Sequence, residues 1–163
     1  MTWFRRAFAV PPPMAASEPE PDGDDPATLR KTMSELNRFL NQNSGQLPGE
    51  SVVTARRVTD VLREVIDTSE IRPLDIYAVI SVKGMLQDYL PTTLRSFLAL
   101  DDAQLSVARP SGRSPIASLQ EQLEALLDAA SGLLSATRAQ DADALLSQGS
   151  FLRTKFSKSD LDL

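Results

Sequence analysis

Apolar side chains recur every three or four residues along most of the chain after residue 25, with polar and charged residues between them. This spacing brings the apolar side chains onto one face of an α-helix. Runs that alternate apolar and polar residues, as a half-buried strand does, are too short to indicate a sheet. The pattern therefore predicts an all-α protein, a helical bundle of about five to six helices behind a disordered N-terminal arm.

Capping and helix-breaking residues mark the ends of these helices. Asp25 before Pro26 is a side-chain cap followed by a proline at the first helical position, so a first helix should begin there. The turn-forming residues at 43–45 should end it. Further helices are expected over residues 50–67, from about residue 73, after residue 91, over 115–137 with Ser114 as its cap, and from Asp141 to residue 156.

The helix expected from about residue 73 carries apolar residues around much of its circumference, which predicts a central place in the bundle. Pro91 interrupts this pattern, because proline has no backbone N–H and disfavours a helical conformation at the residue before it. The chain should therefore either kink or start a new helix there. We interpret Tyr89, Leu90 and Pro91 as a structural corner whose turn is covered by the Tyr89 ring.

The segment from Asp88 to Leu94 reads Asp-Tyr-Leu-Pro-Thr-Thr-Leu, and Phe97 and Leu98 follow it. It resembles the Tyr-Leu-Pro-x-x-Leu signature of XpaC-like helical proteins of bacteria, which are labelled for bromochloroindolyl phosphate hydrolysis. The resemblance spans residues 71–100 and implies that one helix ends and another begins at the signature. It also implies membrane-proximal biology and, by the family label, hydrolysis of phosphate esters.

Composition divides the chain into three parts. Residues 1–25 form the arm, in which residues 9–25 are rich in proline, alanine, glutamate and aspartate and cannot bury a core. Residues 26–156 carry the helical periodicity and form the bundle. Residues 157–163 form a flexible C-terminal tail.

The amino-acid content excludes several kinds of chemistry. The chain has no cysteine, which excludes disulfides, thiolate ligands and cysteine nucleophiles, and no histidine, the commonest general base and metal ligand. The formal net charge is −5, so a basic face for nucleic acid has little support. Asp60, Glu64 and Asp67 share a helix face, but the arginines between them indicate a solvated, salt-bridged surface. We therefore expect no cofactor, no metal and no assignable catalytic residue.

An apolar and basic segment opens the chain. Its large apolar residues Trp3, Phe4 and Phe8 surround Arg5 and Arg6. Large apolar side chains gain nothing in a solvated tail, which favours their contact with a membrane interface or with a groove on a protein partner. The alternatives stay open that the segment packs back on its own bundle or that it has no role.

Residues 116–137 keep an unbroken spacing of three and four residues for about three heptads. The apolar positions that predict a helix-packing or oligomer face are Ile116, Leu119, Leu123, Leu126 and Leu133. Such a face can pack inside the bundle or against a second copy of the chain, so a homo-oligomer is one of two alternatives.

Three functions are consistent with these features. The first is a non-enzymatic helical interaction or scaffolding protein that binds a protein partner. The second is a peripheral membrane-associated protein that uses residues 1–8, and the third is the phosphate-ester hydrolase that the resemblance implies. For all three we expect a cytoplasmic location, including the inner face of the membrane, because the apolar run from Ala7 to Val10 is too short for a secretion signal.

Overall fold

A computed structural model describes residues 23–105, 107, 108, 110 and 112–157. Its α-helices are α1 Pro26–Asn43, α2 Gly49–Asp67, α3 Ile76–Gly84, α4 Leu90–Leu98, α5 Pro115–Ala139 and α6 Ala142–Phe156. Three shorter helical segments are η1 Thr68–Glu70, η2 Met85–Tyr89 and η3 Asp102–Gln104. Because η2 joins α3 to α4 without a break, the described residues form five helical rods and no strand. The predicted all-α helical bundle is confirmed.

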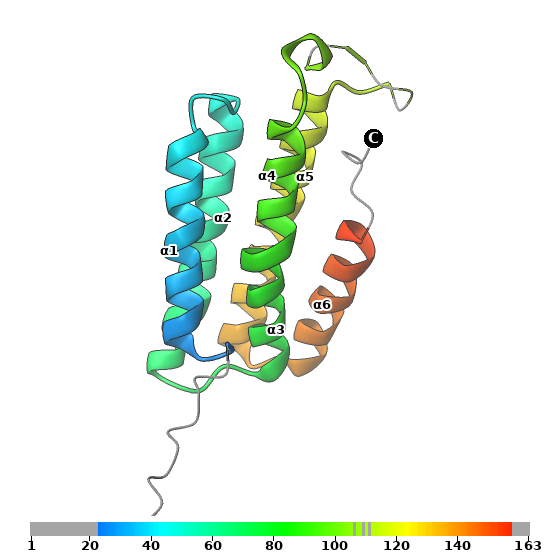
Figure 1. The fold of residues 1–163 in the computed structure, drawn as a ribbon. Helices are drawn as coiled ribbons and strands as arrows, with labels where there is room; N and C mark the ends of the chain where they lie inside the picture. The colour runs from blue at the N-terminus through cyan, green and yellow to red at the C-terminus, as the bar shows by residue number, and fades with distance from the viewer. Residues whose placement is uncertain (1–22, 106, 109, 111, 158–163) are drawn as a thin grey trace, which may run out of the picture.

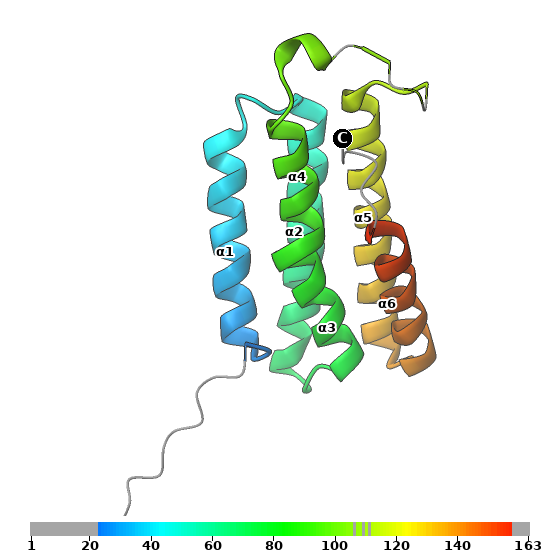
Figure 2. The ribbon, with the colours of Figure 1, turned by 45° about the vertical axis from the view of Figure 1, so that its right-hand side comes forward.

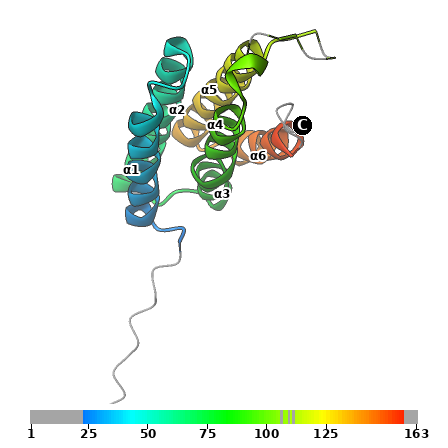
Figure 3. The same ribbon diagram turned by 45° about the horizontal axis from the view of Figure 1, so that its top comes forward.

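The rods stand side by side in two layers with α6 along one side (Figure 1). The most extensive pairing is between α2 and α5, while α1 packs on α2 and α4 packs on α5. The last helix, α6, packs on both α3 and α5. Figures 2 and 3 place α1 and α6 on opposite sides of the bundle, so the α2–α5 pair is its centre.

The core of the bundle is aliphatic. Leu62 of α2, Leu94 of α4 and Leu126 of α5 are all fully buried. Two polar side chains inside the bundle pair with each other, because Thr93 Oγ1 of α4 donates a hydrogen bond to Gln122 Oε1 of α5 at 3.3 Å. Such pairing matters because a buried polar group without a partner destabilises the fold.

Side-chain caps fix where the first and last helices begin. The Asp25 carboxylate accepts hydrogen bonds from the Thr28 hydroxyl and from two amides of the first turn of α1. These bonds, above all the one from the Thr28 hydroxyl, hold the pKa of Asp25 below its ordinary value. Ser114 and Asp141 cap α5 and α6 in the same way. The three caps predicted from the sequence are confirmed.

The rod is wound as a π-helix over η2, just before Pro91. The Leu90 N–H donates to the carbonyl oxygen of Met85, five residues earlier. A π-turn holds an extra residue, which accommodates a proline whose ring and missing N–H oppose a regular α-helix. The corner predicted at Tyr89, Leu90 and Pro91 is therefore a π-helical turn inside a continuous rod, and the chain does not break into two separate helices there.

The third helix, α3, differs from the prediction in two ways. It begins at Ile76, because the Asp75 carboxylate caps it by accepting a hydrogen bond from the Tyr77 N–H at 2.8 Å. Its place is also not central, since Ile76 is 57% exposed and Ile80 is 55% exposed. The apolar residues around α3 thus belong to one buried face and one exposed face, and α2 and α5 take the centre instead.

Candidate protein-docking site

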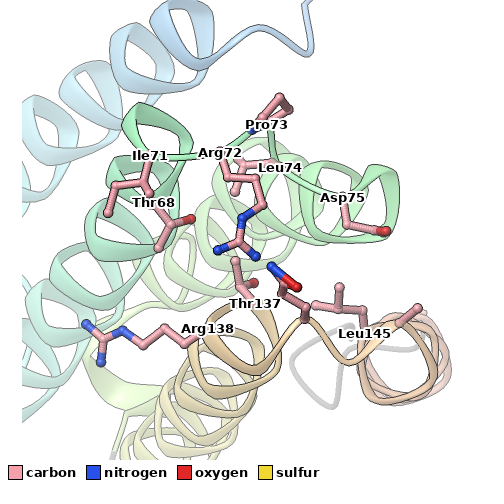
Figure 4. A pocket seen from close by; sticks show the side chains of 11 residues that line it. Thr68, Ile71, Arg72, Pro73, Leu74, Asp75, Thr137, Arg138 and Leu145 are labelled. Atoms are coloured by element: carbon pink, nitrogen blue, oxygen red, sulfur yellow. The ribbon is translucent and has the colours of Figure 1, made fainter.

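A pocket of about 440 Å³ opens at the end of the bundle where α3 and α6 begin (Figure 4). One wall is the loop between η1 and α3, and the other is the end of α5 with the start of α6. Ile71, Leu74 and Leu145 are among its apolar lining residues. Ligand pockets usually measure about 300–1,000 Å³, so this one is large enough for a bulky side chain or a small molecule.

Local hydrogen bonds hold the loop wall in place. Thr68 Oγ1 donates to the carbonyl oxygen of Val65 at 2.6 Å. The backbone N–H groups of Ile71 and Arg72 both donate to the carbonyl oxygen of Thr68, at 3.1 and 3.2 Å. Pro73 then disfavours a helical conformation at Arg72, so the chain extends toward α3. The loop is therefore tied to the end of α2 even though Ile71 is 87% exposed.

The opposite wall contains a strained backbone at Gln140. Its φ is 59° and its ψ is 37°, the left-handed region, and it is the one non-glycine residue with positive φ in the described part of the chain. The Gln140 N–H donates to the Thr137 carbonyl oxygen and the Asp141 N–H donates to that of Ala136, which is the Schellman pattern of a helix end. A side chain in this conformation costs roughly 1–2 kcal/mol. Strain of this kind often accompanies a functional surface.

The two arginines of the pocket differ in their partners. Arg138 Nη2 lies 2.8 Å from Glu64 Oε2, and Figure 4 shows its side chain pointing away from the pocket. Arg72 is exposed, forms no ion pair with any described residue, and extends in Figure 4 from the loop toward Thr137. Asp75 also lines the pocket, but it forms no ion pair with Arg72, so the guanidinium group can bind a carboxylate of a partner through two parallel hydrogen bonds. The pocket therefore suits a group that joins a bulky apolar part to a carboxylate.

The helix-packing face predicted on residues 116–137 lies mostly inside the molecule. Leu119, Leu123, Leu126 and Leu133 are fully buried against the other helices. Ile116 differs because it is 41% exposed near the start of α5. In this fold the four leucines pack within the bundle and are not available to a second copy of the chain.

The carboxylates on one face of α2 form ion pairs at the surface. Asp60 lies 3.0 Å from Arg63, and Asp67 lies 3.0 Å from Arg30 of α1. Glu64 is the partner of the α5 arginine described above. The salt-bridged surface predicted for these carboxylates is confirmed, but only Arg63 pairs from within α2, and the other two partners come from α1 and α5.

The predicted contact segment with Trp3, Phe4, Arg5, Arg6 and Phe8 lies outside the described residues, as does the chain from residue 158 onward. Its contact with a membrane or a partner stays a prediction. Within the described residues, no helix combines the length and the hydrophobicity that a bilayer span needs. The same residues contain no group of three or more acidic side chains placed to hold a metal ion.

Sequence reasoning missed Arg72 and Gln140. The exposed apolar and basic pair Ile71-Arg72 before Pro73 is a usable signal, because proline after such a pair stiffens a surface loop. Gln140 gave no signal, since left-handed helix ends usually carry glycine or asparagine. The two walls also meet only because α5 packs beside α3, which a local pattern does not report.

No protein-family model matches the chain, and no curated protein or solved structure was found to match it. The resemblance to XpaC-like proteins therefore stays a prediction.

Proposed function

We propose that the chain is a non-enzymatic helical interaction module that binds a protein partner at the pocket between the η1–α3 loop and the α5–α6 turn. The observation that carries this proposal is an apolar pocket of about 440 Å³ with the exposed Arg72 at its mouth. Among the described residues, no acidic side chain forms an ion pair with that arginine.

The partner segment is one that carries a bulky apolar side chain close to a carboxylate. The apolar side chain fills the pocket against Leu74 and Leu145, and the carboxylate pairs with Arg72. Ile71 at the rim, 87% exposed, extends the apolar surface beyond the pocket itself. Ile71 also lines the pocket, but most of its side chain faces solvent, so covering it takes a partner that extends over the rim, which favours a protein segment over a small molecule.

The walls of the pocket are formed before the partner arrives. The loop wall is held by hydrogen bonds to Thr68, and the turn wall is held by the helix-end bonds around Gln140. Binding to preformed walls avoids most of the entropy that a flexible surface loses when it becomes ordered. The strained backbone of Gln140 also places its side chain at the pocket, at a cost to stability that a purely structural turn with glycine avoids.

Affinity capture from a native lysate with the full chain and four variants tests the proposal. Arg72→Glu and Ile71→Asp change the site, whereas Arg57→Glu on α2 and Ile116→Asp on α5 make the same changes at exposed positions away from it. A partner should be retained by the unchanged chain and both controls and lost from both site variants. A hydrogen bond to a charged group contributes about 1.5–3 kcal/mol, so Arg72→Glu should weaken binding by at least about tenfold.

Partner capture by the unchanged chain, the two site variants and the two controls decides whether the pocket is the docking site. If every captured protein binds the site variants as well as the controls, the pocket is not the docking site and the proposal fails. Salt dependence gives a second check, since an exposed arginine–carboxylate pair weakens as ionic strength rises.

A further inference from the structure

An apolar face on α3 is left uncovered by the described residues. It consists of Ile76, Tyr77 and Ile80, which are 57%, 40% and 55% exposed, and we call it the α3 face. Residues four apart on a helix are neighbours, so the two isoleucines lie together on one side. Contiguous exposed apolar side chains of this kind mark a place where something binds.

The first described residues of the chain lie next to this face. Asp24 Oδ1 forms an ion pair with Lys83 Nζ at 2.5 Å, and Gly23 lies against the same ammonium group. Lys83 follows Ile80 by three residues and is on the same side of α3. Figure 1 likewise shows the start of α1 near α3. The described part of the chain therefore begins beside the α3 face.

We propose that the segment from Trp3 to Phe8 docks on the α3 face of the same molecule. The occupant has the matching chemistry, because Trp3, Phe4 and Phe8 are large and apolar. The segment also carries Arg5 and Arg6, and the exposed carboxylate of Asp75 stands at the start of α3, directly before Ile76. This docking does not depend on the partner proposed above, although Asp75 also lines the partner pocket.

The chain between the Trp3–Phe8 segment and the bundle is long enough for the segment to reach the α3 face. Residues 9–22 form a linker with a root-mean-square span of about 20 Å if flexible. The distance along α3 from Ile76 to Lys83 is only about 10 Å at 1.5 Å per residue. A short linker of this kind gives an effective concentration on the order of 1 mM. A segment with a dissociation constant of about 0.1 mM would then be docked in about nine-tenths of the molecules.

Tryptophan fluorescence tests the proposal, because Trp3 is the one tryptophan in the sequence and its emission therefore reports on this segment alone. Its emission wavelength and its quenching by acrylamide are measured in the full chain and in a peptide of residues 1–22. Docking should shift the emission of the full chain to shorter wavelength and reduce quenching severalfold relative to the peptide. Both signals should be independent of protein concentration, since the contact is within one molecule.

A double variant of the α3 face and a matched control locate the contact. Ile76→Asp with Ile80→Asp should return Trp3 to the emission and quenching of the peptide. The control carries the same kind of changes at Val53 and Ile116, which are 52% and 41% exposed on other helices, and should keep the signal of the unchanged chain. Circular dichroism of each variant confirms that the helices remain folded.

Three results would overturn the proposal. One is an unchanged chain whose Trp3 is as exposed as in the peptide. Another is a shielded Trp3 that ignores the changes on α3, which places the segment elsewhere. The last is shielding that disappears on dilution, which assigns the contact to a second copy. None of these depends on whether the pocket captures a partner, so the two proposals fail independently.

Discussion

Replacing Gly84 with alanine should change stability in opposite directions depending on whether Tyr89 is present. Gly84 ends α3 with φ −57° and ψ −45°, a helical backbone that alanine adopts without strain. A Cβ atom at this position would lie 2.9 Å from Cε2 of the Tyr89 ring, which is too close. That ring is itself packed on Phe156 of α6, with ring centroids 5.6 Å apart. The extra methyl group therefore has to displace a ring that another helix holds.

The two effects of the substitution can be weighed separately. Alanine in place of glycine stabilises a helix by about 1 kcal/mol, whereas overpacking usually costs about 1–3 kcal/mol. With Tyr89 present, Gly84→Ala should therefore lower the free energy of unfolding by about 0–2 kcal/mol. In a Tyr89→Ala background the obstacle is gone, and the same substitution should raise it by about 1 kcal/mol.

Urea unfolding of the four proteins of this double-mutant cycle measures the coupling directly. The expected coupling between the two positions is about 1–3 kcal/mol, with the same dependence on urea in all four proteins. If Gly84→Ala stabilises the chain equally with and without Tyr89, the ring moves freely and Phe156 does not hold it. That result would contradict the packing argument for a glycine at this place.

Four further predictions follow from burial, hydrogen bonding, a pKa shift and backbone conformation. Leu126 is fully buried, so Leu126→Ala should lower the free energy of unfolding in urea by about 2–5 kcal/mol, and a loss well under 1 kcal/mol would contradict a close-packed core. The hydroxyl of Ser81 is buried without a hydrogen-bond partner in the described part of the chain, so Ser81→Ala should be neutral or stabilising. Ser51→Ala removes a hydroxyl that donates to a glutamine on α5, so it should lower the free energy of unfolding by about 1 kcal/mol in the same urea titration. Equal effects of the two serine substitutions would contradict the view that, of the two, only Ser51 has a hydrogen-bond partner among the described residues. Burial, with the neighbouring aspartate adding to it, raises the pKa of the Tyr89 phenol, so the fold favours its neutral form. The stability that the neutral Tyr89 phenol contributes should be fully present below the pKa of the unfolded phenol, at about 10, and should be lost as pH rises through the higher folded pKa. Thermal melts across pH should show a smaller alkaline loss of stability for Tyr89→Phe than for the unchanged chain. Gln140→Gly relieves a left-handed backbone but makes the unfolded chain more flexible, so it should raise the free energy of unfolding by up to about 1 kcal/mol, and a lower Tm would count against strain there.

The helix ends were predictable because their chemistry is local. Asp25, Ser114 and Asp141 each accept a hydrogen bond from an amide within three residues, and that relation can be read from the sequence without knowing what the helix packs against. The buried stripe of α5 was predictable for the same kind of reason. Its leucines repeat at helical spacing, and a stripe of that width has to be buried somewhere.

The features that could not be predicted depend on contacts between distant parts of the chain. The apolar pattern of α3 is the same whether it is covered on all sides or on one, so Ile76 and Ile80 gave no sign of their exposure. Pro91 predicted an irregularity, but a π-turn, a kink and a break all relieve the same steric conflict. The neighbouring rods favour the continuous form, because both α3 and α4 pack on α5.

Both proposed surfaces lie where the fold can tolerate change. The buried leucines between α2 and α5 stabilise the bundle, whereas Arg72, Ile71 and Ile80 are exposed and contribute little to that core. Substitutions at exposed positions usually alter stability by less than about 0.5 kcal/mol. A loss of partner capture by Arg72→Glu, or of Trp3 shielding by the α3 variants, would therefore report on binding rather than on unfolding. The same separation would let one small bundle carry both proposed surfaces without weakening its core.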